Sequence, residues 1–252
     1  MLRFPLRLSA DILAARFLRG ASPIQFLDAG EILHSHSGHP VSHEKIREIL
    51  SSRSPIVWIG GSEPLVHAGV AHLVRAIAQS GHFVFLETDG TLLRRRIHEF
   101  QPVSRLFLTV RLDPSAERRS PDALRPCAFE LAVEGIRAAQ LSGFFVCVLA
   151  RVAPETQLSA VEELVHLANS RDADGILMLP AAIEADPASP AAQISRQKTS
   201  VARKLIGDVW WRSFSKLAEP LFLRGASAAT TSSSSGQAEQ ESGADEEGVK
   251  VA

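Results

Sequence analysis

The chain has 252 residues, of which 45% are hydrophobic and 22% are charged, and its formal net charge is −1. Such a balance argues against binding nucleic acid through overall charge, and no apolar run approaches the roughly 18 residues that a membrane span requires. The two cysteines, Cys127 and Cys147, exclude a disulfide framework and a four-cysteine zinc site. This cysteine usage is typical of a reducing compartment and predicts a cytoplasmic protein.

Residues 1–20 are predicted to form an amphipathic N-terminal helix between Leu6 and Arg19. Pro5 lies near its start and Gly20 just past its end, which is the usual order of helix start and stop signals. Its arginines, its Asp11 and the lack of a long apolar stretch do not fit a secretory signal.

Residues 21–180 alternate between short hydrophobic runs and helical patterns. Strands are expected at 23–28, 55–59, 82–87, 105–111, 144–152 and 175–179, and helices from 42 and at 67–80, 92–100, 129–141 and 158–170. Near-continuous apolar strands separated by helices predict a parallel sheet that is covered on both faces. Periodicity alone leaves open whether this α/β sheet is doubly wound or closes toward a barrel.

The amino-acid composition changes after Pro180. Residues 181–190 are rich in Ala and Pro and are expected to be a linker, whereas 200–223 are amphipathic and basic and contain Trp210 and Trp211. This C-terminal helical segment is expected either to dock on the domain or to contact a membrane peripherally. Residues 226–252 are rich in Ser, Gly, Glu and Gln and are predicted to be a disordered acidic tail. The predicted units are therefore 1–20, 21–180, 181–225 and 226–252.

Three loops follow the carboxyl ends of the first three strands, where parallel α/β proteins bind ligands. The first loop, 31–43, is rich in histidine. The second is Gly60–Pro64, in which a double glycine lets the backbone approach a ligand closely and Glu63 is available to an ammonium or hydroxyl group. The third is Thr88–Gly90, a tight turn with a second carboxylate. Arg111 follows the fourth strand and is expected either to face the same cavity or to form a surface ion pair.

The second and third loops resemble radical-SAM enzymes, whose second strand ends in Gly-Gly-Glu-Pro and whose third often ends in Thr-Asn-Gly. This chain reads Gly-Gly-Ser-Glu-Pro at 60–64 and Thr-Asp-Gly at 88–90. The resemblance implies a partial (β/α)6 barrel of the radical-SAM and aldolase-type TIM-barrel kind over 21–180, with S-adenosylmethionine as cofactor. It implies cofactor-binding roles for Gly60, Gly61, Ser62, Glu63, Pro64, Thr88, Asp89 and Gly90. Arg111 joins these expected cofactor-binding residues through its place after the fourth strand and not through the resemblance.

The chain departs from this family in the loop after the first strand. That loop carries Cys-x3-Cys-x2-Cys in radical-SAM enzymes, but no cysteine precedes Cys127 here. Because a [4Fe–4S] cluster depends on soft thiolate ligands, the chain is not expected to hold one by itself. The leading hypothesis is a degenerate family member, a pseudoenzyme that serves as a non-catalytic or accessory protein.

Two alternatives remain open. An active enzyme would use a metal held by His34, His36 and His39, since imidazole suits zinc, iron or copper, or would obtain a cluster from a partner protein. A membrane-peripheral interaction protein would use the N-terminal helix and the tryptophan segment.

Ordinary structural roles compete with each of these hypotheses. The histidines fit a solvated loop, Glu63 fits a residue that shapes its turn, and Asp89 fits the N-cap of the 92–100 helix. The arginines at 94–96 fit a solvated helix face rather than a nucleic-acid site.

Overall fold

The computed structural model describes residues 4–17, 22–30, 43–118, 126–181 and 189–232. Its strands are β1 (Ile24–Asp28), β2 (Ile56–Gly60), β3 (Phe83–Thr88), β4 (Leu106–Leu112), β5 (Phe145–Val152) and β6 (Gly175–Pro180). Its α-helices are α1 (Leu6–Phe17), α3 (His43–Leu50), α4 (Val70–Gln79), α5 (Leu93–Arg96), α6 (Ala128–Leu141), α7 (Leu158–Ser170), α8 (Pro190–Ala202) and α9 (Val209–Ser232). Short 3-10 helices are η1 (Pro64–Val66), η2 (Ile97–Glu99) and η3 (Arg203–Leu205).

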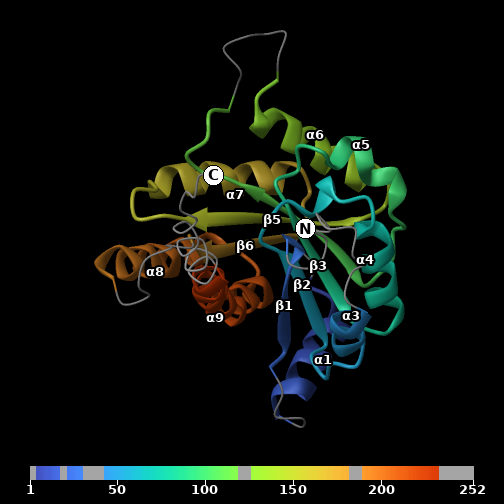
Figure 1. The fold of residues 1–252 in the computed structure, drawn as a ribbon. Helices are drawn as coiled ribbons and strands as arrows, with labels where there is room; N and C mark the ends of the chain where they lie inside the picture. The colour runs from blue at the N-terminus through green and yellow to red at the C-terminus, as the bar shows by residue number, and fades with distance from the viewer. Residues whose placement is uncertain (1–3, 18–21, 31–42, 119–125, 182–188, 233–252) are drawn as a thin grey trace, which may run out of the picture.

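The six strands form one parallel sheet in the order β1-β2-β3-β4-β5-β6. The sheet curls into a half barrel, with α9 on its concave side and α3 to α7 along its convex side (Figure 1). Each strand is followed by its neighbour in the sheet, so every connection crosses over on the same face. The predicted α/β partial barrel is therefore confirmed, and the strand bounds agree with the predicted ones to within a residue.

Several predicted helices differ from the observed ones. The 67–80 helix begins only at Val70, after η1 and Gly69, because glycine is a poor helix former. The 92–100 helix is the single turn α5 followed by the 3-10 turn η2. The predicted linker ends in the start of α8, where Ser189 caps the helix and Pro190 occupies its first turn. The helix α9 continues to Ser232, into the predicted tail.

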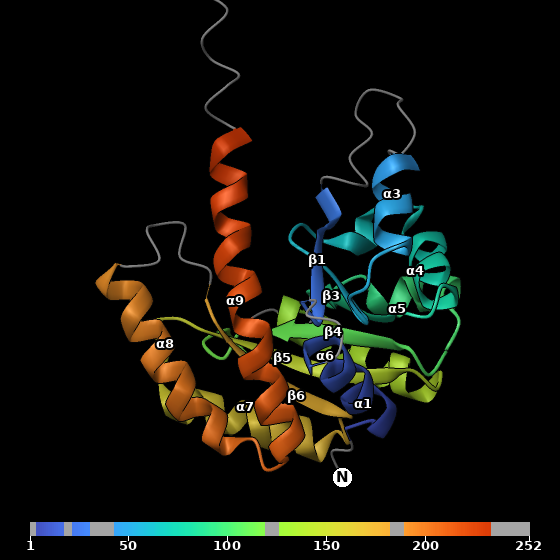
Figure 2. The same ribbon diagram turned by 90° about the horizontal axis from the view of Figure 1, so that it is seen from below.

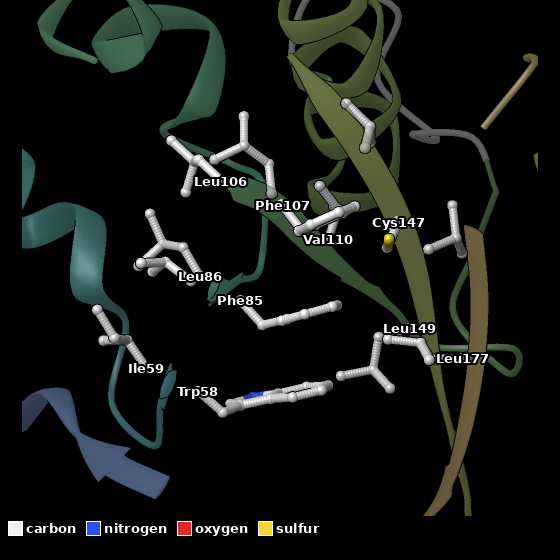
Figure 3. Close-up of a cluster of buried hydrophobic side chains, with 14 of the residues drawn as sticks. Trp58, Ile59, Phe85, Leu86, Leu106, Phe107, Val110, Cys147, Leu149 and Leu177 are labelled. Atoms are coloured by element: carbon white, nitrogen blue, oxygen red, sulfur yellow. The ribbon is translucent and has the colours of Figure 1, made fainter. Parts of the chain in front are cut away.

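Aromatic rings form the floor of the half barrel. Trp58 of β2 stacks on Phe85 of β3 with ring centroids 5.4 Å apart, Phe85 stacks on Phe107 of β4 at 4.7 Å, and Phe107 stacks on Phe145 of β5 at 5.4 Å. These residues share one face because paired residues of parallel strands point the same way. Figure 3 shows Trp58 and Phe85 reaching toward Leu149 across the barrel. The ladder ties four consecutive strands together.

The helix α9 packs against these stacked rings from the concave side of the sheet. Trp211 and Phe214 are buried, and Phe214 lies 5.0 Å from Phe85 between ring centroids. Phe4, just before α1, contacts Trp211 at 4.9 Å. The tryptophan segment is thus docked on the barrel, and Trp210, 49% exposed, is the member of the pair that faces outward. None of the helices in the described ranges is long and apolar enough to cross a bilayer.

Docking of α9 requires a glycine at the start of β6. A Cβ placed on Gly175 would lie 2.5–2.7 Å from the indole of Trp211. We predict that Gly175→Ala lowers the free energy of unfolding by about 1–3 kcal/mol, the usual cost of overpacking a core. Urea unfolding measures this change. The matched control is Gly207→Ala, whose added Cβ meets nothing within 4 Å. Equal stabilities of the two variants would contradict this packing.

Candidate functional site

A cavity of about 410 Å³ opens at the carboxyl ends of β3 to β6. Its volume is within the range of small-molecule sites. Its lining is apolar on the α6 side and charged toward the strands: Asp89, Thr91, Arg111, Leu112, Asp113, Ser115, Ala116, Ala128, Phe129, Ala132, Arg151, Ala153, Glu155, Thr156 and Ala181. The cavity thus offers both cationic and anionic groups to one ligand.

The base of this cavity adjoins a buried carboxylate, Glu87, at the end of β3. The Glu87 side chain is 2% exposed, and its Oε2 accepts a hydrogen bond of 2.9 Å from Nε1 of Trp58. Arg151 of β5 donates to both carboxylate oxygens at 2.9 and 3.2 Å, and Arg111 of β4 donates at 3.3 Å. Two guanidinium groups therefore compensate one buried charge, and both also line the cavity.

Sequence reasoning placed Arg111 at this cavity but missed Glu87 and Arg151. A signal for them was available, because both are charged residues near the end of otherwise apolar strands. A charge in such a position needs a partner, and neighbouring parallel strands supply it.

The double glycine accommodates the protein's own carboxylates. A Cβ on Gly60 would lie 3.0 Å from Oε2 of Glu87, and one on Gly61 would lie 2.7 Å from the carboxylate of Asp28. Gly61 also has φ of +84°, which favours glycine. The groups that lie close to the double glycine thus belong to β1 and β3, and approach of a ligand to it stays a prediction.

Glu63 connects the second loop to the third. Its Oε1 accepts hydrogen bonds from Oγ1 of Thr88 at 2.7 Å and from the backbone N–H of Leu65 at 3.0 Å, while Oε2 accepts from the backbone N–H of Asp89 at 2.7 Å. The carboxylate thus shapes its turn, caps η1 and fixes the distance between the ends of β2 and β3. Burial raises the pKa of Glu63, and the nearby Asp89 carboxylate adds to that rise.

Asp89 does not cap the following helix, contrary to the N-cap interpretation. Its Oδ1 accepts from the backbone N–H and the hydroxyl of Thr91, at 2.8 and 2.7 Å, so it closes a tight local turn. The first residue before α5 is Leu92, which makes no side-chain cap bond. Gly90, with φ of +79°, brings this turn against Ala132 of α6.

The predicted cofactor-binding residues therefore separate into two groups. Asp89 and Arg111 line the cavity, whereas Gly60, Gly61, Glu63, Thr88 and Gly90 hold the loops in place around it. Pro64 is buried and begins η1, and Ser62 is exposed beside Gly30. Cofactor binding by any of these residues stays a prediction.

The residues of the chain do not fit a resident [4Fe–4S] cluster. Cys147 is buried in β5, where burial and the nearby Asp174 raise the pKa of its thiol well above the ordinary value and disfavour a thiolate. Cys127 is the other cysteine, at the start of α6. Within the described residues no group of three His, Cys, Asp or Glu side chains is placed to hold a metal. His34, His36 and His39 lie outside the described residues, so their metal site stays a prediction.

Glu63→Gln tests the link between the loops. An amide cannot accept at both ends, so at least one of the three hydrogen bonds is lost, and we expect the free energy of unfolding to fall by about 1 kcal/mol at pH 7. Urea unfolding of Glu163→Gln, at an exposed carboxylate, is the control.

The pH dependence of that difference follows from the raised pKa of Glu63. The folded protein holds the Glu63 proton more tightly than the unfolded chain does, so protonation favours folding. The associated stability is complete below the ordinary pKa of 4.5 and is lost as pH rises through the folded pKa. The advantage of the wild type over Glu63→Gln should therefore grow as pH falls from 7 toward 4.5. A constant difference would contradict the burial of this carboxyl.

Three solved structures illustrate what the fold resembles. Archaeal TYW1 is 17% identical, with 55% of this chain and 46% of that chain covered and a TM-score of 0.40. TYW1 with a lysine-pyruvate adduct bound is 16% identical, with 66% of this chain and 52% of that chain covered and a TM-score of 0.44. Streptococcus suis SuiB bound to precursor peptide SuiA is 12% identical, with 81% of this chain and 53% of that chain covered and a TM-score of 0.47. Both proteins are radical-SAM enzymes.

The chain spans about half the length of the structures that it matches. Identities of 12–17% and TM-scores below 0.5 carry no argument about ligands or activity. No protein-family model matches the sequence, and no curated protein matches it at a significant level. The half barrel of six parallel strands described above is therefore established by the structure itself.

Proposed function

We propose that this protein is a radical-SAM-like half barrel that binds S-adenosylmethionine in its cavity and serves as a non-catalytic, accessory protein beside a partner. The observation that carries the proposal is the cavity at the carboxyl ends of β3 to β6, with arginine and carboxylate side chains on one wall and apolar side chains on the other. The motifs at 60–64 and 88–90 support the choice of ligand, because they border the same end of the barrel.

The charges of the cavity suit each part of S-adenosylmethionine. The ligand carries a carboxylate, an ammonium group, a sulfonium cation and an adenosine. Arg111 has a side chain that is 37% exposed and uses Nη1 for Glu87, so it has further donors for the ligand carboxylate. Asp89, Asp113 and Glu155 supply acceptors for the cationic groups and the ribose hydroxyls, and the apolar α6 side suits the adenine.

We expect binding without radical chemistry because the chain lacks the three cysteine thiolates that would hold an iron–sulfur cluster. Reductive cleavage of S-adenosylmethionine requires an electron from a nearby cluster, and the thiolates for a cluster are not supplied by Cys127 and Cys147. The bound molecule would therefore remain intact in this protein. An electron source, where one is needed, would belong to the partner.

Arg111→Met tests the cavity directly. We expect isothermal titration calorimetry to show a loss of about tenfold or more in affinity for S-adenosylmethionine, because a charge-assisted hydrogen bond contributes about 1.5–3 kcal/mol. The variant keeps the Arg151–Glu87 pair, so the buried carboxylate remains compensated. Ala153→Phe, which fills the cavity without changing its charge, should have the same effect.

The control for these variants is Arg105→Met. Arg105 also carries a guanidinium, but it lies over the ring of Phe83 at the amino end of the sheet, so its removal should leave the affinity unchanged. Wild-type protein that binds no S-adenosylmethionine, or binding that Arg111→Met and Ala153→Phe both leave intact, would contradict the proposal.

Metal analysis tests whether the chain lacks a cluster of its own, on which the proposed accessory role depends. After anaerobic reconstitution with iron and sulfide, we expect far less than one cluster per chain, because no set of three accessible thiolates exists. Colorimetric iron and sulfide assays beside the visible spectrum measure this. A stoichiometric cluster would contradict the proposal. Iron without sulfide that is lost when His34, His36 and His39 are all changed to Ala would instead establish the histidine site.

A further inference from the structure

The helix α1 has apolar side chains on two opposite sides. Leu8 and Ala15 are buried against the protein. Leu6, Leu13 and Phe17 are 82%, 48% and 74% exposed, and with Ala10 they recur at the spacing of one helix face. A helix with only its inner side apolar would be ordinary, whereas this second apolar side has no covering in the described structure.

The chain just before α1 meets the first turn of α9. Phe4 stacks on Trp210 with ring centroids 6.1 Å apart, and Val209 and Trp210 are 66% and 49% exposed. We call Leu6, Leu13, Phe17, Val209 and Trp210 the apolar rim. Figure 2 shows α1 and the start of α9 at the same end of the molecule. These five residues are almost half of the twelve exposed large apolar side chains among the residues whose burial the structure describes, and they fall on two short segments.

Cationic groups flank the apolar rim. Arg7 and Arg16 are exposed on α1, and the guanidinium of Arg16 lies 5.9 Å from the ring centroid of Phe17. The single acid of α1, Asp11, is half-buried. On α9, Lys216 is exposed. The surface therefore combines protruding aliphatic and aromatic side chains with positive charge, which is complementary to an anionic lipid surface.

We propose that the apolar rim is a membrane-contact surface that docks this end of the barrel on anionic lipid headgroups. The rim consists of exposed side chains on the outward side of one helix and at the start of another, and such side chains suit a fluid surface that closes around them. The half-exposed Trp210 fits the headgroup region, where tryptophan is enriched. The rim lies at the amino ends of the strands, because Trp211 packs on Gly175, the first residue of β6. The cavity at the opposite end would thus stay open to solvent.

The proposal does not depend on the ligand of the cavity. The test uses the full-length chain in co-sedimentation with phosphatidylcholine vesicles that contain or lack 30% phosphatidylglycerol, a composition of about one anionic lipid in three. We expect binding to the anionic vesicles that falls with added salt. Leu13→Ser combined with Phe17→Ser should lower the partition coefficient by about tenfold or more.

The matched control combines Leu141→Ser with Leu158→Ser, two exposed leucines on α6 and α7, and it should bind as the wild type does. Both double variants change exposed residues, and equal urea midpoints would confirm that folding is unaffected. A blue shift of tryptophan emission on vesicle addition, lost in Trp210→Phe, would place the rim at the lipid.

Three results would overturn the proposal. One is a wild type that does not sediment with anionic vesicles, and another is equal sedimentation of the two double variants. The third is a dimer in sedimentation velocity that only Leu13→Ser with Phe17→Ser dissociates, in a protein that ignores vesicles, because a second copy of the chain would then cover the rim.

Discussion

The buried carboxylate of Glu87 is the interaction on which the site depends. It accepts a hydrogen bond from Trp58 of β2 and forms ion pairs with Arg111 of β4 and Arg151 of β5. One side chain of β3 therefore links four strands. An uncompensated charge at this depth would cost several kcal/mol. The two arginines are therefore held in place by the fold itself. As a result, the bottom of the cavity carries guanidinium groups whether or not a ligand is bound.

Glu87 also marks a boundary inside the half barrel. On the amino side of it lie the stacked rings of Trp58, Phe85 and Phe107, closed from below by Trp211 of α9. On the carboxyl side lies the cavity, with its charged strand side and its apolar α6 side. The apolar floor keeps water from the strands, and the polar end presents charge to a ligand. Glu63 holds the loops after β2 and β3 together at this same end of the sheet.

Much of this architecture could be predicted from the sequence, because strands covered on both faces are continuous apolar runs. The runs at 82–87 and 144–152 gave β3 and β5 almost to the residue. The paired loop motifs lie at the carboxyl ends of their strands, which is also the end where the cavity opens. Helix bounds were less predictable, since Gly69 delays α4 and tertiary contacts shorten α5.

The roles of individual site residues were the least predictable part. Glu63 and the glycines at 60 and 61 have the residue types expected of a ligand-binding loop, but their closest partners are Thr88, Glu87 and Asp28. Which groups meet across the barrel depends on strand register, and register is not readable from a single strand. The position of Arg151 opposite Glu87, 64 residues earlier in the chain, follows only once β3, β4 and β5 are aligned.

A crystal structure of the protein grown with S-adenosylmethionine would show directly whether the cavity binds this ligand. We expect density for an intact ligand in the cavity between β3 and β6, with its carboxylate on Arg111 and its cationic groups facing Asp89, Asp113 or Glu155. A well-ordered structure at saturating ligand with an empty cavity, or with the ligand elsewhere on the molecule, would contradict it.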